Sequence, residues 1–367
     1  MVGLLAIFLI TLGLGQLAST LRRLPGLSLV GANLAAGYSV GIVLLVTGSL
    51  LLPHSWWVLM WVLPMEMLTV IVLAIGGSLN PPPNPHRLFE GDHPAHAKWE
   101  AVQIPDGLST IPGLLMRPSK RINIPGSAVC IVPGAGDTKT SFKWRLVETL
   151  LAAGLTVLTI DPPGHGDYHQ RAMSYPDCLS VLPAALDFLR KQPDVTQTGV
   201  IGISLGGALA LRSLAKSADN NNETAQQIAA VVIIATPTRL DYTQALFYRE
   251  LWQTLFRAPS LSLLEEMSVR QARQTWNLGG YRSQHSTADL FTLLDPLKSL
   301  KCLSGIPTLL VYSRRDLVSS PQVAQDMRQA APWADYVESK IASHVMLILT
   351  PSINQQIADW LKEQFRR

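Results

Sequence analysis

The first 79 residues contain only three fully charged side chains, Arg22, Arg23 and Glu66. Three apolar stretches lie in this part of the chain: Met1–Leu21, Leu27–Leu52 and Trp56–Leu79. A helix of about 20 apolar residues crosses the roughly 30 Å hydrocarbon core of a bilayer. A soluble helix seldom stays apolar on every face over such a length. We therefore expect residues 1–79 to form a multi-pass membrane anchor of three transmembrane helices.

The few charges of this segment also predict its orientation. Arg22 and Arg23 lie in the first loop, whereas the second loop, Leu52–Ser55, has no Lys or Arg. Because cytoplasmic loops are enriched in Lys and Arg, we expect the first loop and the C-terminal domain on the cytoplasmic side. Nothing basic precedes Arg22, which disfavours the alternative of a cleaved signal peptide. Glu66 is either a carboxyl that holds the helices together or a functional group within the membrane.

After Leu79 the composition changes to that of a soluble domain, with basic and acidic side chains nearly balanced. The basic residues are scattered among acidic ones, whereas a nucleic-acid-binding face needs a basic cluster, so we expect no nucleic-acid partner. Residues 80–97 begin with Asn-Pro-Pro-Pro-Asn-Pro and are expected to form a stiff linker. The cysteines Cys130, Cys178 and Cys302 show no metal-ligand spacing, so we expect reduced thiols and no metal.

Residues 98–367 show apolar, strand-like runs that alternate with helical patterns. The expected strands are Lys98–Pro105, Leu108–Arg117, Ala128–Val132, Leu155–Ile160, Gly199–Ile203, Ile228–Ala235, Ile306–Tyr312 and Tyr336–Lys340. The expected helices include Trp144–Ala153, Cys178–Lys191, Pro321–Ala330 and Ser352–Gln364. This alternation predicts an α/β fold, with a parallel sheet covered by helices on both faces. The connection between the strands that end at 235 and begin at 306 is far longer than usual, which predicts a helical cap insertion at about 238–300.

A nucleophile motif of the form G-x-S-x-G occurs at Gly202-Ile203-Ser204-Leu205-Gly206. An apolar strand leads into it and a helix rich in small residues leads out, as a nucleophile elbow requires. The sharp turn strains the serine backbone and exposes its hydroxyl above the sheet. The flanking glycines let the strand and the helix approach each other. Ser204 is therefore the candidate nucleophile.

A serine hydroxyl needs a base, and the base needs a carboxylate that fixes its tautomer. In this topology the order along the chain is serine, acid, histidine. Asp316 follows the strand that ends at Tyr312, and His344 precedes the last helix. We expect them to be the acid and the base, with Asp241 as the second candidate for the acid. The alternatives are that Asp316 caps the next helix and that His344 is an ordinary loop residue.

The negative oxygen that develops on the substrate needs two backbone N–H donors. We expect one from Leu205, the residue after the nucleophile, at a helix N-terminus. The other is expected from Ala135, in the loop Pro133-Gly134-Ala135-Gly136 that follows the strand ending at Val132. Gly134 would let this loop bend close to the substrate. The alternative is an ordinary glycine turn.

Taken together, these motifs resemble those of the α/β-hydrolase superfamily of serine hydrolases, over residues 98–367. The matching segments are Pro133–Gly136, Asp161-Pro162-Pro163-Gly164-His165-Gly166, Gly202–Gly206, Asp316 and His344. The resemblance implies an α/β-hydrolase fold with a mostly parallel eight-stranded sheet, acyl-enzyme catalysis and no cofactor. A serine nucleophile departs from the aspartate of haloalkane dehalogenases and from the cysteine of dienelactone hydrolases, which counts against both activities.

The expected function is therefore that of a membrane-anchored serine hydrolase acting on a carboxylic ester or thioester, with the bilayer and a small ester or lipid as partners. Phe247, Leu251 and Trp252 in the expected cap either line an acyl-binding wall or only pack the cap on the core. Acyl transfer and peptide hydrolysis remain open on the same triad. A non-catalytic role in a membrane complex also remains open. A further alternative is that the three helices form a transport module, which only Glu66 supports. The sequence does not determine the oligomeric state.

Overall fold

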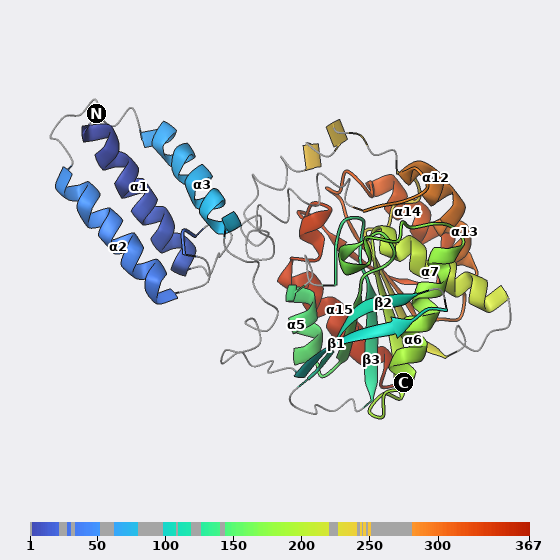
Figure 1. The fold of residues 1–367 in the computed structure, drawn as a ribbon. Coiled ribbons are helices and arrows are strands. Elements are labelled where there is room, and N and C mark those ends of the chain that lie inside the picture. The colour runs from blue at the N-terminus through green and yellow to red at the C-terminus, as the bar shows by residue number, and fades with distance from the viewer. Residues whose placement is uncertain are drawn as a thin grey trace. The chain divides into compact units, whose positions relative to one another are not determined.

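A computed structural model describes residues 2–21, 28–30, 34–51, 62–79, 98–107, 109–118, 126–139, 144–219, 227–240, 243, 245, 246, 249, 250 and 281–367. The chain divides into two compact units (Figure 1). One contains the N-terminal helices and the other contains the sheet and the helices that cover it. The change of composition after Leu79 thus falls near the division between the two units.

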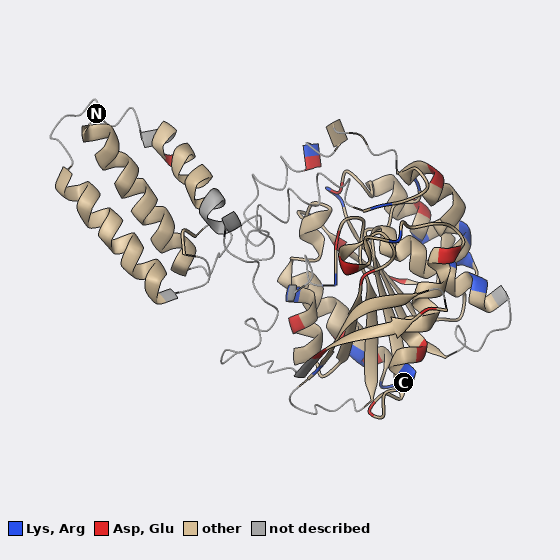
Figure 2. Cartoon of the chain, viewed as in Figure 1, with Lys and Arg blue, Asp and Glu red and all other residues tan. Residues whose placement is uncertain are grey.

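Three apolar helices form the first unit: α1 (Val2–Leu21), α2 (Leu34–Leu51) and α3 (Val62–Leu79). Helix α1 packs against both of the others. Its approach to α2 depends on glycine, because a Cβ atom at Gly13 would lie 2.6 Å from the backbone nitrogen of Leu45. Small residues at such crossings are typical of helices that pack within membranes. Figure 2 shows the helices almost without charge, whereas charged residues are spread over the second unit.

Among the described residues, one helix is both long and apolar enough to cross a membrane, namely α1. Its 20 residues rise about 30 Å. Shorter apolar segments lie within α2 and α3, at Ala35–Leu51 and Pro64–Leu73. The expectation of three transmembrane helices is therefore supported for the first helix alone. Glu66 is exposed on α3, and an interhelical hydrogen bond joins Thr11 to Thr69 at 2.8 Å.

One eight-stranded sheet forms the centre of the second unit, in the order β1-β2-β4-β3-β5-β6-β7-β8. The strands are β1 (Lys98–Pro105), β2 (Thr110–Arg117), β3 (Ser127–Val132), β4 (Thr156–Ile160), β5 (Gln197–Ile203), β6 (Ile228–Ile234), β7 (Thr308–Ser313) and β8 (Asp335–Ser339). The pairs β1–β2 and β2–β4 are antiparallel, and the other five pairs are parallel. The expectation of a mostly parallel eight-stranded sheet is confirmed.

Helices cover both faces of this sheet (Figure 1). They are α5 (Trp144–Ala152), α6 (Val181–Arg190), α7 (Leu205–Asp219), α12 (Thr287–Leu294), α13 (Pro296–Lys301), α14 (Pro321–Ala330) and α15 (Pro351–Gln364), with short 3₁₀ turns η3 (Gly166–Tyr168), η4 (Asp177–Ser180) and η6 (Val345–Leu347). Helices α5 and α15 pack together, whereas α7 packs with α6, α12 and α13. Every residue of β3, β4 and β7 is buried, which explains why these strands are continuous apolar runs in the sequence.

The expected helix Cys178–Lys191 is divided in the structure, because its first residues form η4 and α6 begins at Val181. Pro183 has no N–H to donate to the carbonyl of Leu179, so regular α-helical bonding does not extend further back. In the expected cap insertion, residues 251–280 lie outside the described part. The later helix α12 contributes Leu290 and Phe291 to the main hydrophobic core. The cap boundaries at about 238 and 300 stay a prediction.

Candidate active site

The carboxyl ends of the parallel strands meet at one edge of the sheet. Val132 at the end of β3 pairs with Gly202 of β5, and Ile203 pairs with Ile234 at the end of β6. Loops that leave such an edge form the binding crevice of open α/β sheets. The turn after β5 carries Ser204 and the loop after β7 carries Asp316, while His344 follows β8.

Ser204 occupies a sharp turn between β5 and α7. Its φ angle is +50°, in the left-handed region that costs a non-glycine residue about 1–2 kcal/mol. Strand β6 and the residues after it hold this backbone, because the Ser204 N–H donates to the carbonyl of Ile234 at 2.8 Å and Thr236 Oγ1 donates to the Ser204 carbonyl at 3.0 Å. Because these two bonds fix the Ser204 backbone, they also fix the direction in which its side chain leaves the turn.

A glycine is required at position 206, where the first turn of α7 meets the end of β3. A Cβ atom there would lie 2.2 Å from the carbonyl oxygen of Val132 and 2.3 Å from that of Pro133. Heavy atoms that are not bonded do not approach so closely. The close fit brings the start of α7 against the loop that follows β3.

His344 and Asp316 lie in line with Ser204. The Ser204 Oγ is 3.1 Å from His344 Nε2, and His344 Nδ1 is 2.8 Å from Asp316 Oδ2. Because a carboxylate only accepts hydrogen bonds, Nδ1 carries the proton and Nε2 is free to accept from the hydroxyl. The structure therefore brings together the three residues that the sequence singled out, which are separated by as many as 140 positions.

The carboxylate of Asp316 is fixed on both oxygens. Its Oδ1 accepts from the N–H groups of Val318 and Ser319, both at 2.7 Å, while Oδ2 faces His344. The Asp316 side chain has no exposed surface. These bonds fix the orientation of the carboxylate plane relative to the imidazole ring. Asp316 precedes α14, but Ser320 caps that helix, so the helix-cap alternative does not describe it.

The hydroxyl of Ser313, at the end of β7, joins the loop of Asp316 to the loop of His344. Its oxygen lies 2.6 Å from the carbonyl oxygen of Ala342 and 3.2 Å from that of Ser339. Ser313 is itself buried. Asp316 and His344, 28 positions apart, thus lie on segments that are bonded to each other.

Two carboxylates determine the electrostatics of the imidazole. Burial acts to lower the pKa of His344, but the charge of Asp316, its hydrogen bond to Nδ1 and the charge of Glu250 outweigh it, so the pKa is raised above its ordinary value. Negative charge beside the imidazole favours the imidazolium form. This is the form that a base reaches when it takes a proton from a hydroxyl.

The loop after β3 lies directly against Ser204. A Cβ atom at Gly134 would be 3.2 Å from Ser204 Cβ, so this position leaves little room for a side chain. The N–H of Asp137 donates to the Gly134 carbonyl at 3.1 Å, which closes a tight turn around Ala135. Leu205 is the first residue of α7, where backbone N–H groups have no partner within the helix. Of the two expected oxyanion donors, Leu205 thus adjoins Ser204 along the chain, and Ala135 follows the glycine that approaches the Ser204 side chain.

A buried ion pair that sequence reasoning missed holds Lys139, which lies in the loop after β3. Asp161, which is fully buried, accepts from Lys139 Nζ at 2.7 Å, from the Lys139 N–H at 2.6 Å and from the Asp167 N–H at 2.9 Å. Burial acts to lower the pKa of Lys139, but the charges and hydrogen bonds of Asp161 and Asp167 raise it above the ordinary value. The motif that begins at Asp161 was identified, but its cation lies 22 positions earlier and gives no local signal.

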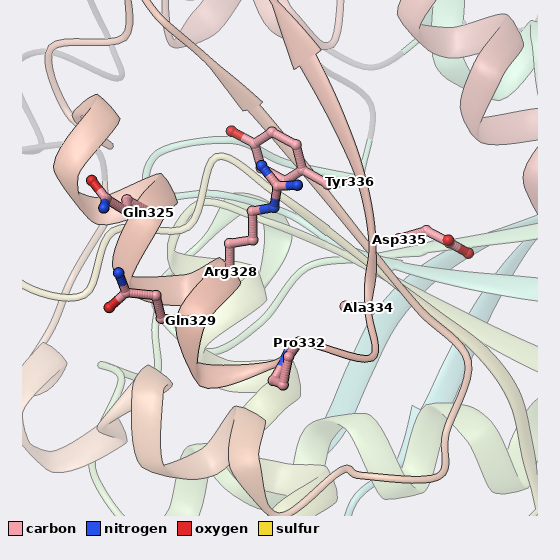
Figure 3. A pocket seen from close by; sticks show the side chains of 7 residues that line it. All are labelled: Gln325, Arg328, Gln329, Pro332, Ala334, Asp335 and Tyr336. Carbon is pink, nitrogen blue, oxygen red and sulfur yellow. The ribbon is translucent and has the colours of Figure 1, made fainter.

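Several predicted residues lie outside the described part of the chain: Asp241, Phe247, Leu251 and Trp252. A hollow of about 590 Å³ lies elsewhere, between α14 and the start of β8 (Figure 3). The Arg328 guanidinium stacks on the Tyr336 ring there, 4.9 Å from its centre. None of the residues that line the hollow belongs to the triad or to the expected oxyanion donors. Among the described residues, no group of His, Cys, Asp or Glu is arranged to hold a metal ion.

Known proteins of similar structure share this architecture. The esterase Pf2001 of Pyrococcus furiosus matches with a TM-score of 0.53 and 19% identity, over 73% of this chain and 92% of its own. A bromoperoxidase from Bacillus anthracis matches with a TM-score of 0.53 and 18% identity, over 72% and 100%. A fungal esterase from Rhizomucor miehei matches with a TM-score of 0.52 and 15% identity, over 80% and 95%. At these identities the likeness is one of fold.

Sequence comparison identifies the family. No curated protein matches the sequence significantly. The sequence model of the alpha/beta hydrolase family does match, over residues 129–360, which is most of the chain. This range begins in β3 and ends in α15, and it includes Ser204, Asp316 and His344. The chain therefore belongs to the alpha/beta hydrolase family.

Proposed function

We propose that the protein is a membrane-anchored serine hydrolase that cleaves a carboxylic ester or thioester. One observation carries the proposal, namely the chain of hydrogen bonds from Ser204 Oγ through His344 to Asp316, at 3.1 and 2.8 Å. A hydroxyl, an imidazole and a buried carboxylate in this order are the elements of a nucleophile activated by a base. The esterases among the structures of similar fold agree with this chemistry.

The reaction has two halves. In the first, Ser204 Oγ attacks the carbonyl carbon, and its proton passes to His344 Nε2. The N–H groups of Ala135 and Leu205 donate to the oxygen that becomes negative. His344 then gives the proton to the leaving alcohol or thiol as the bond to the acyl carbon breaks. In the second half, His344 takes a proton from water as the water oxygen attacks the acyl carbon. His344 then gives that proton to Ser204 Oγ as the acyl–oxygen bond breaks, which releases the acid and restores Ser204.

Replacing Ser204 tests the proposal. We expect Ser204→Ala to lose labelling by a fluorophosphonate probe and at least about 10³-fold in turnover of p-nitrophenyl esters. A matched control is Ser213→Ala, which removes a buried hydroxyl from the same helix that follows the nucleophile. The control should retain labelling and turnover. Undiminished turnover by folded Ser204→Ala would refute the assignment.

We propose further that the substrate carries an apolar acyl chain. A site tethered to a bilayer meets lipid esters at high local concentration, and the predicted cap residues Phe247, Leu251 and Trp252 are apolar. A series of p-nitrophenyl esters from acetate to palmitate measures the preference, which should rise with chain length. A constant kcat/KM along the series would contradict it. Adding a competing alcohol and analysing the products separates hydrolysis from acyl transfer.

We also propose that α1, together with α2 and α3, anchors the protein in a membrane. In this proposal the hydrolase unit lies on the cytoplasmic side. The membrane attachment is supported by the length and hydropathy of α1 and by its packing against two further apolar helices. Cys302 is exposed, whereas Cys130 and Cys178 are buried. A membrane-impermeant maleimide should therefore label Cys302 in inverted vesicles and not in right-side-out vesicles, with Cys302→Ser as the control. Labelling only in right-side-out vesicles would reverse the orientation.

A further inference from the structure

A second carboxylate, from outside the proposed triad, contacts the residue that carries the base. Glu250 lies in the long connection between β6 and β7, and only 6% of its surface is exposed. Its Oε1 accepts a hydrogen bond from the backbone N–H of His344 at 2.5 Å, across 94 positions of sequence. A buried carboxylate is costly unless it is paired or hydrogen-bonded, so its position next to the base calls for a physical explanation.

The bond acts on the backbone from which the imidazole projects. His344 is the residue before the 3₁₀ turn η6, and its side chain makes no capping bond there because it faces Ser204 and Asp316. A bond to the His344 N–H therefore fixes the peptide without competing for either ring nitrogen. Charge-assisted bonds of this kind are shorter and stronger than those between neutral groups.

The same carboxylate contributes to the electric field at the ring. Within the described residues, the charged groups that face His344 are Asp316, from the loop after β7, and Glu250, from the connection after β6; the Ser204 hydroxyl faces it from the turn after β5. Both charges are negative, so both favour an imidazolium. Asp316 bonds to the ring at Nδ1, while Glu250 bonds to the backbone N–H of the same residue.

We propose that Glu250 is a positioning residue for the base, which holds the His344 backbone in place and stabilises the positive charge that the imidazole acquires during acyl transfer. The inference rests on the proposed function, because it concerns the same site.

The test uses the full-length chain in detergent micelles and compares Glu250→Gln, Glu250→Ala and Glu363→Gln. The amide of glutamine still accepts from the His344 N–H but carries no charge, whereas alanine removes both the acceptor and the charge. Glu363, in the last turn of α15, pairs with Arg367 beyond the end of the helix, so Glu363→Gln makes the same change in net charge as a control. Labelling with a fluorophosphonate gives the active fraction of each sample, and kcat/KM is then measured against pH.

We expect Glu250→Gln to shift the acid limb of the kcat/KM profile to lower pH by about one unit, because an opposite charge nearby stabilises the protonated imidazole in the native chain. Glu250→Ala should show the same shift and, per active site, a further loss of kcat of about tenfold or more, because the base is no longer held. KM should change little in both. Glu363→Gln should match the native chain in both quantities.

A purely structural role would lower the melting temperature and the active fraction and leave the limb in place. An unmoved limb in Glu250→Gln would therefore overturn the inference, even if Glu250→Ala does not fold. NMR titration of ring-labelled histidine follows His344 directly and does not need turnover. If the native chain has no hydrolase activity, the proposed function fails, while a lower His344 pKa in Glu250→Gln would still support the charge that we assign to Glu250.

Discussion

The strained backbone of Ser204 leads to a prediction in which two inactive variants differ in stability. Replacement by alanine removes the hydroxyl but keeps a Cβ atom at a φ angle of +50°, whereas replacement by glycine removes both. A residue with Cβ pays about 1–2 kcal/mol in this conformation. Glycine lowers the free energy of unfolding by about 0.4–1 kcal/mol, because it increases the conformational entropy of the unfolded chain. Ser204→Gly should therefore be more stable than Ser204→Ala by about 0.5–1 kcal/mol.

For a domain of this size the difference corresponds to about 1–4 °C in melting temperature. Tryptophan fluorescence on heating, in detergent, measures it, and both variants should fail to react with a fluorophosphonate. Ser213 in the interior of α7 is the matched control, since glycine there should be less stable than alanine by about 1 kcal/mol. The sign of the difference should thus be opposite at the two positions. If Ser204→Gly is no more stable than Ser204→Ala, the serine turn is not strained as argued.

Three further predictions concern the surroundings of Ser204. Because protonated His344 cannot accept the Ser204 proton, kcat/KM should rise with pH through the raised pKa, with its half-point above about 6.5, the ordinary value for histidine; a half-point below 6.5 would contradict the electrostatic argument. Gly206→Ala places a methyl group against the Val132 carbonyl and should lower stability by about 1–3 kcal/mol and fluorophosphonate labelling at least tenfold, as denaturant unfolding and a labelling time course would show. Lys139→Met leaves the Asp161 carboxylate buried without its cation and should lower the free energy of unfolding by about 3 kcal/mol. An unchanged midpoint of urea unfolding would argue against a stabilising role of this ion pair.

The sequence predicted the sheet well, because buried parallel strands are apolar on both faces. The expected strand Gly199–Ile203 lies inside β5 and ends at the same residue, next to Ser204. Element ends that depend on a single side chain were harder to predict, as the interruption by Pro183 before α6 shows. The number of helices long enough to cross a membrane was the other difference, since apolar composition does not reveal where a helix ends.

The three residues of the proposed triad could be singled out because each follows a strand in a recognisable order. Glu250 and Lys139 could not, although both carry charge close to the site. Their partners, His344 and Asp161, are 94 and 22 positions away, and neither contact leaves a periodic or spaced pattern in the chain. A side chain whose role depends on tertiary packing has no local signature, so the supporting contacts of the site could be read only from the fold.

The hydroxyl of Ser313 has a mechanical consequence. By linking the segment of Asp316 to the residues just before His344, it joins the mounts of these two side chains on β7 and β8. Ser204 is fastened to the end of β6, through Ile234 and Thr236. The two mounts are also joined to each other, because the Tyr312 hydroxyl donates to the Thr236 carbonyl at 2.9 Å and Ser319 Oγ donates to the Ala235 carbonyl at 2.6 Å. A displacement of β6 against β7 that parted Ser204 from His344 would therefore also disturb these two buried bonds.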